Sequence, residues 1–329
     1  MKVFLKGFMV AIVLVVVSTV AVFASDSYFT KINASDKQAS SELTSIITDY
    51  FDGVDYERKT QDENKKNNDN LLINSEESGG SDDSGEETPR PDFNSGLDAY
   101  LYALNRYITA KTIVVETSGY ADTAIGKQYI KCIRQRNSAG HLYYTALAYS
   151  DFIQVAREAY YDGRIFRQRT SDKVSAAMVP SFDGNWIQSS SFISAMRNYK
   201  QKYGVGPDEL NYIVSAESIK SETFDKNICK QSLDNGGTYT FSLQLHPNIA
   251  GEKYKYSVKE NAGAKNLPNF EMVEVEVTIN AKGDFVKIVS KDKYSLTVAG
   301  VTSDVKSFVT DTFIRIDNKS FDVNVPSGL

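Results

Sequence analysis

The chain has 329 residues, of which 41% are hydrophobic and 12% aromatic, enough to bury a sizeable core. Its formal net charge is −5, but the segment Asp55–Asp92 alone, with twelve acidic and five basic residues, carries −7. The rest of the chain is therefore slightly positive, without the basic stripe or basic helix that phosphate binding requires. Length, composition and charge together predict an ordinary globular domain and exclude nucleic acid as an expected partner.

Residues 1–24 have the pattern of an export segment. Two lysines precede an uncharged apolar run, Gly7–Ala24, and Val22-Phe23-Ala24 places small residues at the −3 and −1 positions of a secretory cleavage site. The run is also nearly long enough to cross a bilayer uncleaved. We therefore expect either a cleaved signal peptide or an N-terminal membrane anchor, and in both cases an extracytoplasmic protein, secreted or anchored to the cell membrane.

Two further segments precede the main domain. In residues 25–54, an apolar stripe predicts a short amphipathic helix, formed by Leu43, Ile46, Ile47, Tyr50 and Phe51. Few Lys or Arg residues flank the stripe, which favours packing on the main domain over docking on a membrane surface. Residues 55–92 are polar, acidic and almost free of aromatic residues, so they predict a disordered linker.

Residues 93–329 are predicted to form one α+β domain. It opens with the helix of "GLDAYLYALNRYITA", for which Ser95 is a suitable N-cap. Residues with a period of two follow, and Asp162-Gly163 is a strong hairpin signal. A second helix, in "SSFISAMRNYKQKYG", ends at Gly204, and Pro207–Glu209 predicts the first turn of another. Strands then resume at "TYTFSLQL".

The stretch Phe270–Val298 is the most regular part of the pattern. It predicts three antiparallel strands, with turns at Lys282-Gly283-Asp284 and at Lys291-Asp292. No βαβ alternation occurs, so the fold class expected is α+β, a single strongly curved antiparallel sheet (a half-barrel) covered by a few helices. One face of the sheet is expected to be wholly apolar. Tyr294 is expected on this covered face. The tentative wall of a cavity comprises Val273, Val275, Val277, Ile279, Val286, Ile288, Leu296, Val298 and Trp186.

Residues suited to catalysis are sparse. The two histidines, His141 and His246, lie near neither a nucleophile elbow nor a reactive cysteine. Glu274 and Glu276 alternate with valines, which predicts that they lie on the solvent face of a strand rather than form a catalytic pair. Motifs for metals, dinucleotides and phosphates are also missing from the sequence. We expect no enzyme activity, no metal and no cofactor.

Cys132 and Cys229 are the only cysteines. Export permits a disulfide between them, whereas two buried free thiols are the alternative. The sequence leaves both open.

The order of elements resembles the LolA/LppX-like lipoprotein-carrier superfamily. The similarity lies in the opening helix, the "AREAYYDGRIFRQRT" hairpin, the helical insertion and the closing "VEVEVTINAKGDFVKIVSKDKYSLTV…VKSFVTDTF". The resemblance covers residues 93–329 and implies a half-open antiparallel barrel covered by helices, with acyl chains or lipids held in its concavity. This chain departs from many members because it has no lipidation cysteine and carries an acidic linker.

Two hypotheses for the function follow. In the first, an envelope protein binds a hydrophobic ligand, a lipid or the acyl chain of an acylated protein, in the concavity of the sheet. In the second, a membrane-tethered envelope sensor or protein-interaction module uses the same fold without a bound lipid. The second predicts a filled concavity and an exposed apolar patch. We expect a monomer, attached to the membrane through its N-terminal segment if that segment is not cleaved.

Overall fold

The structure is a computed structural model that describes residues 91–124, 126–151, 154–182, 185–262, 264–298 and 301–329. The predictions for residues 1–24 and 25–54, and for nearly all of 55–92, lie outside the described residues. Among the described helices, none is long and apolar enough to cross a membrane.

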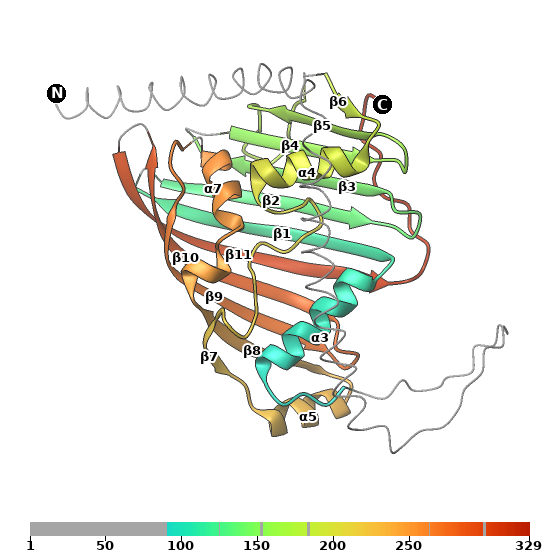
Figure 1. Ribbon diagram of the computed structural model, residues 1–329, viewed down its shortest axis with the longest axis vertical. Helices are drawn as coiled ribbons and strands as arrows, with labels where there is room; N and C mark the ends of the chain where they lie inside the picture. Colours follow the sequence, from blue (N-terminus) through green and yellow to red (C-terminus); the bar gives the residue numbers. More distant parts are fainter. Residues whose placement is uncertain (1–90, 125, 152–153, 183–184, 263, 299–300) are drawn as a thin grey trace, which may run out of the picture. The chain divides into compact units, whose positions relative to one another are not determined.

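Five helices and eleven strands make up the described residues (Figure 1). The helices are α3 (Gly96–Thr109), α4 (Phe192–Tyr203), α5 (Lys226–Asp234), α6 (Pro247–Ala250) and α7 (Tyr254–Ala262). The strands are β1 (Thr112–Thr123), β2 (Gly126–Arg136), β3 (Leu142–Tyr149), β4 (Gln154–Tyr161), β5 (Phe166–Ser171), β6 (Ile187–Ser189), β7 (Ile219–Thr223), β8 (Thr238–Leu245), β9 (Asn269–Asn280), β10 (Phe285–Val298) and β11 (Val301–Asp317).

All eleven strands belong to one antiparallel sheet, in the order β6-β5-β4-β3-β2-β1-β11-β10-β9-β8-β7. The first and last long strands of the domain, β1 and β11, therefore pair at the centre of the sheet. The two halves extend outward from this pair by successive hairpins, as the period-two patterns predicted. Because the sheet is open and curved, with helices on one side, the expected α+β half-barrel architecture is confirmed (Figure 1).

Helices α3, α4 and α7 cover the same face of the sheet, which we call the inner face (Figure 1). Helix α3 is capped as predicted, since the Ser95 hydroxyl accepts a hydrogen bond from the Asp98 amide. Its buried side packs Ala99, Tyr100 and Ala103 onto β8, β9 and β10 in the main hydrophobic core. A smaller core forms between α4 and β2–β5, where Tyr199 meets Tyr144. The inner face thus has two hydrophobic cores, and α7, which packs against α4, contributes Val258 to the main one.

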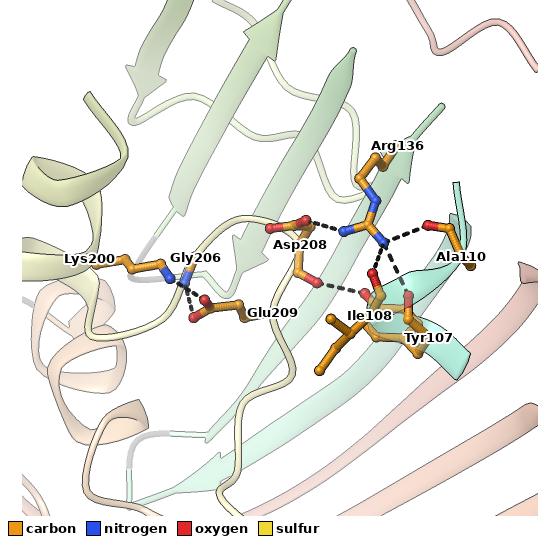
Figure 2. A network of polar contacts seen from close by, with 8 residues as sticks. All are labelled: Tyr107, Ile108, Ala110, Arg136, Lys200, Gly206, Asp208 and Glu209. Carbon is orange, nitrogen blue, oxygen red and sulfur yellow. Dashed lines mark hydrogen bonds and ion pairs between the residues drawn. The ribbon is translucent and has the colours of Figure 1, made fainter. Parts of the chain in front are cut away.

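The segment 205–218 joins α4 to the other half of the sheet, and we call it the strap. The Arg136 guanidinium on β2 donates to three carbonyls at the C-terminal end of α3, those of Tyr107, Ile108 and Ala110, and pairs with Asp208 of the strap at 2.7 Å (Figure 2). In the same strap, Glu209 accepts from the Gly206 amide and pairs with Lys200 of α4 (Figure 2). One arginine therefore satisfies carbonyls that have no partner within the helix and fixes the strap to the sheet.

Three local predictions are wrong. Pro207–Glu209 forms turns rather than a helix, because the side chains of Asp208 and Glu209 are engaged by Arg136 and Lys200. Lys291-Asp292 is not a turn, because β10 continues through it: Lys291 pairs with Glu274 on one face, and Asp292 accepts a hydrogen bond from Tyr212 on the other. The inner face is also not wholly apolar, as the next section describes.

Gly204, which ends α4 at a φ of 76°, provides a test of this packing. A Cβ there would collide with the Lys253 carbonyl just before α7, whereas at Gly236, with a φ of 71°, a Cβ would meet nothing within 4 Å. We expect Gly204→Ala to lower the free energy of unfolding by more than about 2 kcal/mol, since it adds a clash to the cost of about 1 kcal/mol for a left-handed alanine. Urea unfolding measures the difference. Equal losses in Gly204→Ala and the matched control Gly236→Ala would contradict the close approach of α4 and α7.

Candidate functional site

Most residues that were predicted to line a ligand cavity are buried in the hydrophobic core. Val273, Val275, Val277 and Ile279 of β9 point to the inner face and are 0–2% exposed in the main core. Ile288, Tyr294 and Leu296 of β10 belong to the same core. The residues that were expected to contact a lipid are thus buried in the main core, together with residues of α3, α6 and α7.

Two wall residues at the ends of β10 are placed differently. The register of β9 and β10 shifts between Phe285 and Lys287, which puts Phe285, rather than Val286, opposite Ile279. Val286 is half-buried and outside the main core. Val298 pairs with Val301 at the end of the β10–β11 hairpin.

Trp186 lies on the opposite face of the sheet, which we call the outer face. Its ring is 4.2 Å from the Arg169 guanidinium, and Arg169 pairs with Glu158 directly across β4 and β5. Since side chains alternate along a strand, Glu158 and Arg169 point away from their neighbours Arg157 and Thr170 on the inner face. The structure therefore does not bring Trp186 together with the valines of the predicted wall.

The candidate cysteines and histidines are likewise apart. Cys132 and Cys229 are both buried free thiols, Cys132 in the core under α4 and Cys229 in the main core. Of the two alternatives for the cysteines, the structure has the unbonded one. His141 is half-buried beside the Asp162-Gly163 turn, and His246 is exposed at the end of β8.

A polar band crosses the inner face between the two hydrophobic cores. At its centre Arg134 of β2 pairs with Asp311 of β11 at 3.1 Å and donates to the Thr117 hydroxyl between them at 2.7 Å. All three are buried, at 5%, 6% and 3% exposure. Nothing in the local sequence predicted this ion pair, since Arg134 and Asp311 are 177 positions apart.

A second buried carboxylate in the band, Asp292, is 2% exposed. It accepts hydrogen bonds from the Tyr212 hydroxyl of the strap, at 2.6 Å, and from Ser307 of β11. Burial raises the pKa of Asp292, and the two hydrogen bonds oppose that shift only in part. Among the described residues, no cation pairs with it.

Helix α4 covers a third polar group, Arg157 of β4. Its guanidinium lies 4.0 Å from the centre of the Tyr203 ring, in a small cavity also lined by Tyr144 and Tyr199. Arg157 is 7% exposed, and its Nη1 has no hydrogen-bond partner. The inner face of the described sheet therefore holds, besides the Arg134–Asp311 and Arg136–Asp208 pairs, two separate charges, Asp292 and Arg157, that have no oppositely charged partner.

The outer face carries a row of aromatic side chains, half-buried in β3 and β1 and exposed in β2 and β11, which we call the outer aromatic row. Tyr149, Tyr129, Tyr120 and Phe308 stand directly opposite one another on β3, β2, β1 and β11. Tyr129 is 51% and Phe308 37% exposed, and the rings of Tyr120 and Phe308 are stacked. Facing strands are about 4.8 Å apart, so the row extends roughly 14 Å across four strands.

A row of charged residues runs beside the aromatic one. Lys127, Asp122, Lys306 and Lys293 occupy facing positions on β2, β1, β11 and β10. Lys306 and Lys293 are exposed and directly opposite each other, an arrangement of like charges that destabilises a sheet. Within the described residues, neither lysine forms an ion pair, although Asp122 faces Lys306 across β1 and β11.

No protein-family model and no curated protein matches the sequence. Among solved structures, the chain is similar to the crystal structure of a DUF1329 family protein from Desulfovibrio piger ATCC 29098, with 12% identity and a TM-score of 0.22. The match covers 69% of this chain and 93% of that one. The LolA/LppX-like resemblance accordingly stays a prediction, and the curved open sheet stands on the structure alone.

The Arg134–Asp311 pair should be essential for stability. We expect Arg134→Met to lower the free energy of unfolding by about 3–5 kcal/mol, because it leaves Asp311 charged and buried without a partner. The control Lys291→Met breaks the half-exposed pair with Glu274 and should cost less than about 1 kcal/mol. Chemical denaturation of both variants tests this, and similar losses in the two would contradict a buried pair.

Asp292 should make stability depend on pH. Since its pKa in the folded protein is raised above the ordinary value of 3.8, the folded state binds this proton more tightly than the unfolded state. The stability contributed by Asp292 is therefore complete below pH 3.8 and is lost as pH rises through the folded pKa. We expect the free energy of unfolding of Asp292→Asn, relative to wild type, to increase over this range and then level off.

Urea unfolding at a series of pH values measures that difference. Asp304→Asn, at an exposed position of the same hairpin, controls for the loss of a carboxylate. A gap between Asp292→Asn and wild type that stays constant from pH 3 to pH 7 would contradict the raised pKa.

Proposed function

We propose that this chain is an exported, membrane-tethered interaction module of the cell envelope, and that it binds an acidic protein partner on the outer face of its sheet. The observation that carries the proposal is the outer aromatic row beside the lysines at positions 293 and 306. Tyrosine and other aromatic residues are enriched in protein interfaces, where they contribute much of the binding energy. The two facing lysines cost stability in the free protein, which an acidic partner would offset.

The alternative, a lipid held on the inner face, has less support. The β9 and β10 side chains of the predicted wall are packed in the main core with residues of α3, α6 and α7, and Val277 and Ile279 are 0% exposed. An acyl chain would have to displace these helices, of which α3 is held at its C-terminal end by Arg136 and the strap. The inner face therefore favours a module with a filled concavity. The proposed role is one of binding rather than catalysis, and export and tethering rest on the pattern of residues 1–24.

Photo-crosslinking in the host cell tests the proposed interface. A photoreactive amino acid at position 308 should give a discrete protein adduct, because this side chain lies in the outer aromatic row. The matched control is position 312, which is exposed on the same strand and face but outside the row. We expect the adduct at 308 to decrease several-fold in a Lys293→Thr/Lys306→Thr background and at high salt.

Two results would contradict the proposal. One is equal crosslinking from positions 308 and 312. The other is binding of the full chain to vesicles of anionic lipid that is lost on Phe308→Ser, which would make the partner a membrane surface.

The free protein should also be unchanged or more stable by a few tenths of a kcal/mol in Lys306→Thr, since the facing like charges are removed.

A further inference from the structure

The cavity around Arg157 is a candidate site on the inner face, separate from the proposed interface. It lies between α4 and strands β3 to β5, and its volume is about 10 Å³, room for about one water molecule. Its lining includes the buried Tyr144, Tyr199 and Tyr203, the paired Glu158 and Arg169, and Thr170, which is exposed and places the cavity near solvent. A small solute could therefore reach it without unfolding of the core.

Arg157 brings a full positive charge into this cavity. Arginine stays protonated in proteins, and a buried charge without a partner is costly. The neighbouring carboxylate, Glu158, belongs to the outer face and is held by Arg169 at 2.6 Å. On the inner face, Asp311 shares a cross-strand row with Arg157 but stands four strands away, roughly 19 Å along the sheet. Asp311 is also already paired with Arg134.

The helix that covers the cavity adds no negative charge. Between Phe192 and Tyr203, α4 contains Arg197, Lys200 and Lys202 and no acidic residue. Glu209 of the strap is engaged by Lys200 and the Gly206 amide. The helix over Arg157 thus carries only cationic charges, and Glu158, the carboxylate residue of the lining, is engaged by Arg169.

We propose that this cavity binds a monoatomic anion of about the size of chloride, held by the Arg157 guanidinium. The unpartnered Nη1 supplies a charged donor. The tyrosine hydroxyls around it supply neutral donors, and burial raises the pKa of Tyr144 to about 12, so its proton is retained at any physiological pH. A monoatomic anion in this cavity would neutralise the charge of the guanidinium. A water molecule in the same place would not.

Thermal unfolding of the full chain at constant ionic strength tests the proposal, with sodium chloride replacing sodium gluconate, whose anion is too large for the cavity. We expect Tm to rise with chloride and to saturate, by about 3–6 °C at a tenfold excess over the Kd. Sodium bromide should act similarly. Arg157→Gln should abolish the response, whereas the control Arg164→Gln, which removes an exposed arginine at the Asp162-Gly163 turn, should retain it.

Tyr203→Phe keeps the ring over Arg157 and removes one hydroxyl, so it gives a second test if Arg157→Gln fails to fold. It should weaken the apparent chloride affinity several-fold. A Tm that does not depend on chloride, or a chloride response that is identical in wild type and both cavity variants, would overturn the proposal. A response to acetate but not to chloride would also overturn it, since the cavity would then take the carboxylate of a larger ligand. None of these outcomes depends on the outer face.

Discussion

Covering the inner face of one long curved sheet is the constraint on which the rest of the structure depends. Eleven strands give a surface too large for a single helix, so α3 packs on β8–β10 and α4 packs on β2–β5, each with its own core. The space between the two layers is filled by the strap and by polar side chains. Arg136 links these parts, because one guanidinium satisfies the end of α3 and pairs with the strap.

The polar band follows from this division. Where neither helix reaches the sheet, charges such as Arg134 and Asp311 are buried by the strap and by one another. Buried pairs of this kind contribute little net stability compared with apolar residues, but they penalise other arrangements of the same strands strongly. We infer that the band determines how the two halves of the domain meet. In the strap, Tyr212 donates a hydrogen bond to Asp292, and Asn211 accepts one from Arg134.

Sequence patterns predicted the sheet well and its polar contents poorly, for a physical reason. Alternation along a strand is local, so the inward positions of Val273, Val275 and Val277 could be read directly from their spacing. Lys291-Asp292 has the composition of a turn, but pairing with β9 and β11 and side-chain contacts with Glu274 and with Tyr212, which is 80 residues from Asp292, place it in a strand. Trp186 follows a long connection whose path determines which face it reaches, and no local pattern encodes that path. The outer aromatic row was also missed, since its four members come from four strands and become neighbours only through register.

The two faces of the sheet differ in what their unusual residues can do. On the inner face, uncompensated charges such as Arg157 are enclosed, so their partners are limited to what fits beside packed side chains. On the outer face, Lys293 and Lys306 are exposed, so water and ions weaken their mutual repulsion. Their ammonium groups are accessible to a partner. This difference is why we assign the proposed protein partner to the outer face and the proposed small anion to the inner face.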